Sequence, residues 1–215
     1  MVPFSINVAT VGVLFAGGQS RRMGGGDKSL QALGGRSMIA HAIDTLAAQV
    51  DALIINANGD AARFAAFGLP VVPDRDADFA GPLAGLLAGM MWTRAHCPAA
   101  RHVMTAACDT PFFPADIAAR LSAAAGAADA DIAIAASGGQ GHFVFGLWPV
   151  ALADDLEAYL AEGRRKVQDW IARYAHVTVD FLPVEIGGAS VDPFFNINTP
   201  EDLAQAEALL AKGSR

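Results

Sequence analysis

The sequence predicts a single-domain, three-layer α/β/α fold, in which helices cover both faces of a mostly parallel, Rossmann-like sheet. Short apolar runs of strand type alternate with Ala- and Leu-rich stretches of helical spacing, an order typical of parallel sheets. Gly, Asp or Asn follows several of these runs, at the strand ends where such sheets bind ligands. No linker interrupts the chain, so we expect residues 1–215 to form one domain.

The individual elements follow from local patterns. Apolar runs of strand length predict strands at residues 11–15, 53–56, 71–73, 102–107, 132–136, 144–148 and 177–182. Apolar residues at helical spacing predict helices at residues 38–50, 61–67, 83–93, 114–125, 152–160, 166–174 and 200–211. Pro114 and Pro200 suit the first position of a helix, where the N–H that proline lacks has no partner in any case.

Composition excludes several classes of protein. Hydrophobic residues make up 53% of the chain and charged residues 17%, a balance that excludes a disordered protein. No apolar run approaches the roughly 20 residues of a membrane span, and the N-terminus lacks a signal-peptide pattern. The net charge of -7 argues against nucleic acid as a partner, because phosphate backbones bind basic surfaces. We therefore expect a cytoplasmic protein with neither nucleic-acid nor membrane partners.

The cysteines and histidines carry no catalytic or metal-binding signature. Cys97 and Cys108 are too few for a metal cluster or a disulfide framework, which fits a reducing compartment. Cys108 is expected to be a small buried residue that fills space. The histidines lack metal-binding spacing, and no Ser/His/Asp or Cys/His arrangement for a protein nucleophile stands out.

A glycine-rich loop follows the first predicted strand, where residues 14–28 read LFAGGQSRRMGGGDK. Glycines allow backbone N–H groups to turn toward an anion, and the cations Arg21, Arg22 and Lys28 would add charge beside a triphosphate. The alternative is a flexible surface loop with solvated charges. The loop is neither a Walker A loop, because Asp27 precedes the lysine, nor a dinucleotide-binding GxGxxG loop.

Oxygen-bearing side chains stand at two further positions of interest. Asp109 follows a buried strand, where it could hold Mg²⁺, although a turn or helix-capping role would also explain it. Asn196 and Asn198 flank Ile197 and therefore point the same way if the segment is extended, toward substrate, phosphate or metal. Thr199 is expected to cap the last helix.

Four further motifs follow the loop in order: INAN at residues 55–58, Asp74 with GPLAG at 81–85, CDTPF at 108–112 and FNINTPEDL at 195–203. Together with the loop, they resemble the nucleotidyltransferases that act on cofactor and sugar phosphates, and among them the molybdenum cofactor guanylyltransferases. The resemblance covers nearly the whole chain. One departure is His142-Phe143, where the family pattern has His-Pro, at a position that the resemblance relates to the acceptor pocket.

The resemblance implies that GMP is transferred from GTP to the phosphate of Mo-molybdopterin, with Mg²⁺ as cofactor. It assigns Lys28 and Arg22 to phosphate charge, Asp109 to the metal, and Asn196 and Asn198 to substrate. It assigns the nucleoside to Asn56, Asp74 and the backbone of Phe15, Ala16 and Gly17. Because Gly17 has no Cβ, we expect room for a guanine edge against the backbone, whereas related cytidylyltransferases tend to carry Ala there. The alternative is that Gly17 serves only the turn.

Some alternatives stay open at this point. The rival activities are cytidylyl or sugar-phosphate transfer, and non-catalytic GTP binding by a regulator or a cofactor-delivery protein. Molybdoenzyme apoproteins or their chaperones are possible partners. The basic run Arg164-Arg165-Lys166 is either a solvated helix end or a docking point for an anionic acceptor, and His142 either faces the acceptor or is structural.

Overall fold

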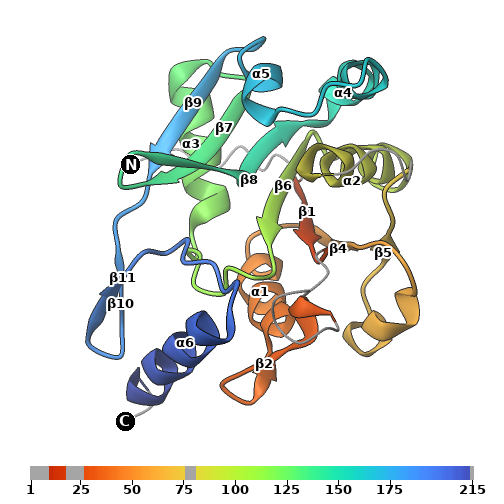
Figure 1. Ribbon diagram of the computed structural model, residues 1–215. Helices are drawn as coiled ribbons and strands as arrows, with labels where there is room; N and C mark the ends of the chain where they lie inside the picture. Colours follow the sequence, from red (N-terminus) through yellow and green to blue (C-terminus); the bar gives the residue numbers. More distant parts are fainter. Residues whose placement is uncertain (1–9, 18–26, 76–80, 214–215) are drawn as a thin grey trace.

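The computed structural model describes residues 10–17, 27–75 and 81–213. Within them, a seven-stranded sheet has the order β5-β4-β1-β6-β8-β7-β9 (Figure 1). Its strands are β1 (Thr10–Phe15), β4 (Ala52–Asn56), β5 (Val71–Val72), β6 (His102–Ala107), β7 (Ile132–Ser137), β8 (Gln140–Pro149) and β9 (His176–Asp180). All neighbouring pairs are parallel except those of β8, which is antiparallel to β6 and β7. The prediction of a mostly parallel sheet is confirmed.

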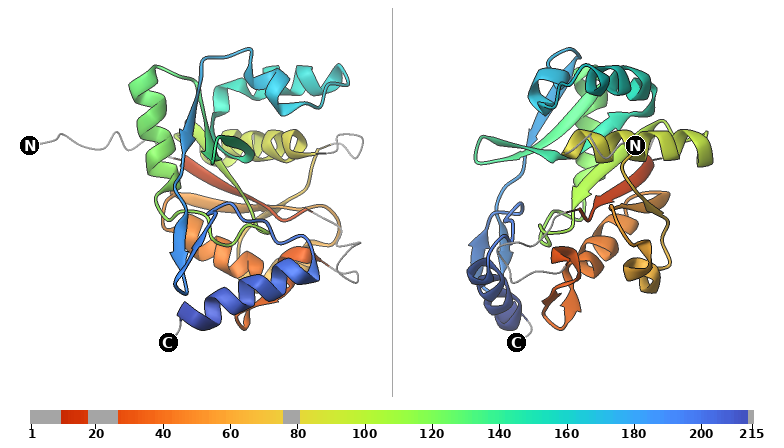
Figure 2. Two further views of the ribbon diagram at one scale, coloured as in Figure 1. Left: turned by 60° about the vertical axis from the view of Figure 1, so that its left-hand side comes forward. Right: turned by 45° about the vertical axis from the view of Figure 1, so that its right-hand side comes forward.

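Helices cover both faces of this sheet (Figures 1 and 2). The helices α1 (Met38–Ala47) and α3 (Ile117–Ala128) pack on one face, whereas α2 (Pro82–His96), α4 (Ala153–Ala161) and α5 (Val167–Ile171) pack on the other. Neighbouring strand residues serve opposite faces: Val13 packs with the α2 side and Leu14 with the α1 side. At Gly89 of α2 a Cβ would come within 2.6 Å of the Val13 side chain, so glycine permits this close helix–strand contact.

Shorter elements complete the chain. The hairpins β2 (Ala32–Leu33) with β3 (Arg36–Ser37) and β10 (Val184–Ile186) with β11 (Ala189–Val191) were not expected from the sequence. The 3-10 helices are η1 (Lys28–Leu30), η2 (Ala61–Phe67) and η3 (Val150–Leu152). Helix α6 (Pro200–Gly213) packs through Ala206 against Leu33 of β2 and Ile197. None of the described helices is long and apolar enough to cross a membrane.

Several predicted helix boundaries were wrong. The helix expected from Pro114 begins at Ile117, because residues 114–116 form a separate turn in which the Ile117 N–H donates to the Pro114 carbonyl. Helix α5 ends at Ile171 rather than residue 174, and single turns follow it, in which Tyr174 N–H donates to the Ile171 carbonyl. Pro200 does begin α6, as expected.

Candidate nucleotide and metal site

The candidate site lies where β1, β4 and β6 end side by side. Phe15 is in register with Asn56 on one side and with Ala107 on the other. Just beyond the strands, the Ala16 N–H donates to the Asn56 carbonyl at 2.9 Å, and the Cys108 N–H donates to the Phe15 carbonyl at 3.1 Å. The loops that follow the three strands therefore leave the sheet together, at the edge where parallel sheets bind ligands.

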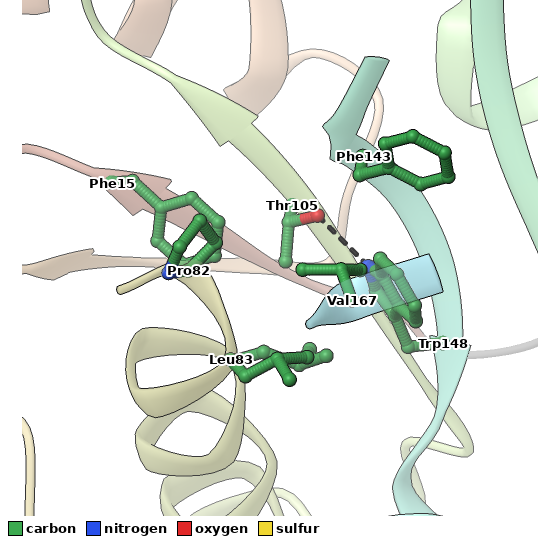
Figure 3. Close-up of a pocket in the computed structure, with 8 residues that line it drawn as sticks. Phe15, Pro82, Leu83, Thr105, Phe143, Trp148 and Val167 are labelled. Atoms are coloured by element: carbon green, nitrogen blue, oxygen red, sulfur yellow. Dashed lines mark hydrogen bonds between the residues drawn. The ribbon is translucent and has the colours of Figure 1, made fainter. Parts of the chain in front are cut away.

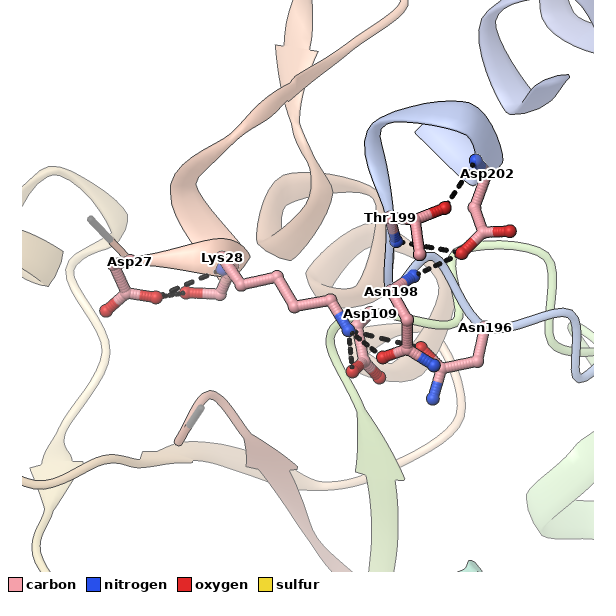
Figure 4. A network of polar contacts seen from close by, with 8 residues as sticks. Asp27, Lys28, Asp109, Asn196, Asn198, Thr199 and Asp202 are labelled. Atoms are coloured by element: carbon pink, nitrogen blue, oxygen red, sulfur yellow. Dashed lines mark hydrogen bonds and ion pairs between the residues drawn. The ribbon is translucent and has the colours of Figure 1, made fainter. Parts of the chain in front are cut away.

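Lys28 is the centre of one half of the site (Figure 4). Its ammonium donates to Asp109 Oδ2 at 2.6 Å, to Asn198 Oδ1 at 2.6 Å and to Asn196 Oδ1 at 3.3 Å. These three acceptors match the three donors of an ammonium group. Side chains from the glycine-rich loop, the β6 end and the segment before α6 thus converge on one point, and the lysine side chain is only 13% exposed.

The side chains of the two asparagines, Asn196 and Asn198, point the same way (Figure 4). Ile197 between them is fully buried, and its N–H donates to the Asp109 carbonyl at 2.9 Å. The alternation expected from the sequence is confirmed, since both amide oxygens accept from the same lysine. The backbone link to Asp109 fixes the separation between the asparagines and the carboxylate.

The start of α6 holds this segment in place. Thr199 Oγ1 accepts from the Asp202 N–H at 3.1 Å, as a helix cap should, so the predicted cap is confirmed. In return, Asp202 Oδ2 accepts from the N–H groups of Asn198 and Thr199, each at 2.8 Å. The pKa of Asp202 lies below its ordinary value, mainly because its carboxylate accepts the hydrogen bond from the Asn198 backbone. The hydrogen bonds from Thr199 lower this pKa further. This reciprocal cap orders the backbone that carries Asn198.

The second half of the site is an amide–carboxylate cluster at the end of β4. Asn56 Nδ2 donates to the Val72 carbonyl at 3.1 Å and to Asp74 Oδ1 at 2.9 Å. Asn58 Nδ2 donates to Asp74 Oδ2 at 2.8 Å, and its own Oδ1 accepts from the Asp74 N–H. A Cβ on Gly85 would lie 2.3 Å from Asn56 Oδ1, so the glycine of the α2 motif makes room for this amide.

Gly17 borders open space. A Cβ built there would meet no atom of the described residues within 4 Å, and Gly17 is not among the described glycines with positive φ. Turn geometry therefore gives no reason for glycine at this position. Ala16 next to it is buried, while Gly17 is exposed at the edge of the site. Arg22, the other cation expected at the phosphates, lies outside the described residues.

An ion pair that sequence reasoning missed borders both halves. Arg63 of η2 donates through Nε to Asp27 Oδ2 at 2.6 Å, and Asp27 immediately precedes Lys28. Its Nη groups donate to the carbonyls of Asn58 and Asp60. The sequence carried no signal for this contact, because the partners are 36 residues apart and Arg63 stands in no recognised motif.

A second missed network anchors the chain before Asn196. Ser137 Oγ donates to the Asp192 carboxylate at 2.8 Å, so His142 Nε2–H donates in turn to Ser137 Oγ at 2.7 Å. Asp192 Oδ1 also accepts from the Phe194 N–H, and the His142 ring stacks on Phe194 with centroids 4.4 Å apart. Burial lowers the pKa of His142, against the opposing effect of the Asp192 charge. These contacts favour the structural interpretation of His142.

Phe143, which replaces the proline of the family pattern, lines an apolar pocket beside β1 (Figure 3). Phe15, Pro82, Val167 and Trp148 contribute to the same lining, and the Trp148 indole N–H donates to Thr105 Oγ1 at 2.8 Å. The pocket has no room for a water molecule. The departure from the family pattern therefore adds an aromatic ring to the packing between the sheet and α2.

The basic run at residues 164–166 lies elsewhere, between α4 and α5. It borders an open hollow of about 480 Å³ that Tyr159 and Asp169 also line. Arg164 pairs with Glu162 at 3.3 Å, and Arg165 donates to the Leu160 carbonyl at 2.6 Å. Both arginines thus bind groups close to them in sequence, as expected at a helix end.

Cys108, next to Asp109, is a buried residue that fills space, as expected, since only 2% of it is exposed. Burial raises the pKa of its thiol, and the negative charges of Asp109 and Asp27 raise it further.

The Lys28 half of the site also offers ligands for a metal ion. The described residues contain no group of three His, Cys, Asp or Glu side chains that could hold a metal. Asp109 with the oxygens of Asn196 and Asn198 does form a set of hard ligands around a cation, the Lys28 ammonium. That set fits Mg²⁺, which needs few protein carboxylates when phosphates and water complete its shell.

Comparisons with known proteins identify relatives of the chain. The family described as MobA-like NTP transferase domain matches residues 12–177. The molybdenum cofactor guanylyltransferase of Bradyrhizobium sp. (strain ORS 278) is 53% identical over 212 residues, 98% of each chain, and that of Rhodopseudomonas palustris (strain BisB5) is 50% identical over 100% of both. Among solved structures, molybdopterin-guanine dinucleotide biosynthesis protein A from Archaeoglobus fulgidus superposes with a TM-score of 0.72 at 23% identity, covering 94% of this chain and 99% of that one.

Proposed function

The chain belongs to the MobA-like NTP transferases and, among them, to the molybdenum cofactor guanylyltransferases, and from this premise we propose that it transfers GMP from GTP to the phosphate of Mo-molybdopterin. The products are the guanine dinucleotide form of the cofactor and pyrophosphate. The observation that carries the proposal is the convergence of Asp109, Asn196 and Asn198 on the Lys28 ammonium beside the ends of β1 and β4.

The reaction needs no protein nucleophile. An oxygen of the acceptor phosphate attacks the α-phosphorus of GTP, and the bond between that phosphorus and the bridging oxygen breaks. The electron pair leaves with pyrophosphate, in line with the attack. Because both reactants are anions, catalysis consists mainly of charge neutralisation and positioning. We assign Lys28 to the phosphate charge, together with Arg22.

Mg²⁺ is the proposed cofactor, and Asp109 is its proposed protein ligand, with the amide oxygens of Asn196 and Asn198 close by. When bound, the ion would supply positive charge to the phosphates and a fixed geometry for them. Family members generally use a divalent metal, which agrees with this assignment. Lys28 exchanges its ammonium contact with Asp109 for phosphate oxygens when the nucleotide binds.

The nucleoside is assigned to the other half of the site. We assign it to the backbone of Phe15, Ala16 and Gly17, together with Asn56 and Asp74. Phe15 is in register with Asn56, and a Cβ on Gly17 would meet no described atom within 4 Å. Within the described part of the chain, each Asp74 carboxylate oxygen accepts one side-chain hydrogen bond, and each has a second lone pair. Asp74 can therefore also accept from the N–H groups of a guanine edge, which cytosine presents differently. This supports GTP over CTP.

The proposal extends to the setting of the reaction. We place the enzyme in the cytoplasm, with molybdoenzyme apoproteins or their chaperones as recipients of the product. The rival activities differ in substrate: cytidylyl or sugar-phosphate transfer would use another nucleotide or acceptor, and a non-catalytic GTP-binding protein would release no pyrophosphate.

Pyrophosphate release tests these options together. The purified protein is incubated with Mg²⁺, Mo-molybdopterin and either GTP or CTP, and each reaction is repeated without acceptor and with a chelator. We expect release with GTP only, dependent on both acceptor and metal. Release with CTP at a comparable rate, or binding of GTP without any release, would contradict the proposed function.

A further inference from the structure

Arg63 connects the two halves of the candidate nucleotide site. Its Nε donates to Asp27 Oδ2 at 2.6 Å, Nη2 donates to the Asn58 carbonyl at 2.7 Å, and Nη1 donates to the Asp60 carbonyl at 2.5 Å. Each guanidinium nitrogen therefore has an acceptor. The side chains of Arg63 and Asp27 are 26% and 15% exposed, so this ion pair is better shielded from water than the other described arginine–carboxylate pairs.

The Arg63–Asp27 ion pair supports the half of the site that is centred on Lys28 and assigned to the phosphates. Asp27 Oδ1 accepts from the Ser29 N–H at 3.0 Å and from Ser29 Oγ at 2.7 Å, which begins the 3-10 turn η1. Lys28 lies inside this turn. With Oδ1 used for the turn and Oδ2 used for Arg63, Asp27 fixes the backbone from which the Lys28 side chain extends to Asp109.

The hydrogen bond from Arg63 to the Asn58 carbonyl supports the other half of the site, the cluster of Asn56, Asn58 and Asp74 that is assigned to the nucleoside. Asn58, whose carbonyl accepts from Arg63, holds Asp74 through both atoms of its own amide. Asp74 in turn holds Asn56. Arg63 itself is kept in place by its neighbour Phe64, which is fully buried and lies under the guanidinium with 4.5 Å between the Arg63 Cζ and the ring centroid.

We infer that Arg63 is a positioning residue, which holds the Lys28 turn at a fixed separation from the Asn56–Asn58–Asp74 cluster, so that a nucleoside triphosphate meets both at once. This rests on the proposed function for the identity of the ligand. A guanidinium can do this because its planar fork bonds several acceptors in fixed directions, whereas a lysine ammonium is a point charge. Preorganising the two halves removes an ordering cost from triphosphate binding.

Loss of Arg63 should affect a nucleoside triphosphate, which contacts both the Lys28 turn and the Asn56–Asn58–Asp74 cluster, more than a ligand that contacts the cluster alone. In Arg63→Met the nucleoside cluster keeps its own hydrogen bonds, because Asn58 and Asp74 bind each other directly. We expect Mg-GTP to bind about tenfold more weakly, while GMP binding changes less than about twofold. The KM for GTP should rise by a similar factor, while the KM for the acceptor stays constant. Equal weakening of GMP and GTP, or no weakening of either, would overturn the inference.

Matched variants separate positioning from general damage. Arg94→Met removes an exposed ion pair with Asp154 at the far end of α2 and should leave both affinities unchanged. Arg63→Lys keeps the positive charge but not the planar guanidinium, so we expect its affinity for Mg-GTP to lie closer to that of Arg63→Met than to that of the wild type. Asp27→Asn should weaken Mg-GTP binding as much as Arg63→Met does. The variant that carries both substitutions should bind Mg-GTP no more weakly than either single variant. Additive losses would mean that Arg63 does not act through Asp27.

Amide hydrogen exchange keeps the test independent of turnover. In Arg63→Met without nucleotide, we expect faster exchange at Ser29 of η1 and at Gln31, the residue that ends this turn, and unchanged exchange in Arg94→Met. Unchanged η1 exchange in Arg63→Met would overturn the inference even if transfer activity fell. Conversely, a wild-type protein that transferred no GMP would contradict the proposed function, and the exchange result would still decide the role of Arg63.

Discussion

Two segments of this acidic chain carry basic residues that sequence reasoning singled out, the loop that ends at Lys28 and the run at residues 164–166, and their described contacts differ. Lys28 bonds partners 81 and 170 residues away, Asp109 and Asn198. Arg165 donates to the nearby carbonyls of Leu160 and Arg164, and Arg164 pairs with Glu162. The comparison shows that convergence of distant segments, rather than the density of basic residues, distinguishes the candidate catalytic site.

The largest expected effect comes from removing the Asp109 carboxylate, which accepts from the Lys28 ammonium and is the proposed metal ligand. Asp109→Asn keeps the shape of the side chain but loses its charge, so metal-dependent turnover should fall about 1000-fold or more. Asp169→Asn, which changes the acid beside the basic run, should leave the rate within about twofold because its region takes no part in the reaction. Rates measured at limiting Mg²⁺, with circular dichroism to verify folding, make the comparison. Near-normal turnover of Asp109→Asn would remove the metal assignment.

The two lysines give the next largest contrast. Lys28→Ala loses a charge contact made in the transition state and should lower kcat/KM on the order of 100-fold or more. Lys166→Ala should change it by about twofold at most, since Lys166 lies at an exposed helix start. Steady-state kinetics with GTP compare the two variants. Similar losses for both would place the phosphates, or an anionic acceptor, at the basic run instead.

A smaller effect concerns base selection beside the Lys28 site. Gly17→Ala adds a methyl group to the open space at the end of β1, so we expect the preference for GTP over CTP to fall about tenfold. The ratio of kcat/KM for the two nucleotides measures it. If the variant keeps the wild-type ratio, the function stands, but Gly17 is not the reason for guanine selection.

The smallest effect is expected at the anchor of the asparagine segment. Asp192→Asn weakens the bonds from Ser137 Oγ and the Phe194 N–H, which hold the chain four residues before Asn196. Turnover should fall only about threefold, because the α6 cap holds the same segment from its other end. The ratio of the kcat of Asp192→Asn to that of the wild type measures this effect. A loss as large as that of Lys28→Ala would give Asp192 a direct role.

The sequence predicted the parts of the fold that local patterns determine. The strands that end at Phe15, Asn56 and Ala107 were predicted because buried parallel strands are short, continuous apolar runs. The common direction of Asn196 and Asn198 followed from the alternation of an extended chain. The hairpins β2–β3 and β10–β11 were missed because strands of two or three residues are too short to show a period.

Contacts between distant segments account for what sequence reasoning missed at the site. The Arg63–Asp27 pair depends on where the buried Phe64 sets η2 against the end of the glycine-rich loop. The Ser137–Asp192 bond joins residues 55 positions apart, across β7 and the segment after β11. Neither pair has characteristic spacing, so only the folded chain reveals them. The roles of the predicted site residues stay predictions until the variants are measured.

The fate of an α-labelled phosphate tests the central claim most directly. GTP carrying ³²P at the α-position is incubated with Mo-molybdopterin, Mg²⁺ and the wild-type, Lys28→Ala or Lys166→Ala protein, and the products are separated. We expect the label in a molybdopterin guanine dinucleotide for the wild type and Lys166→Ala, and almost none there for Lys28→Ala. Label that remains in GTP or appears only as free GMP with the wild type would contradict guanylyl transfer at the Lys28 site.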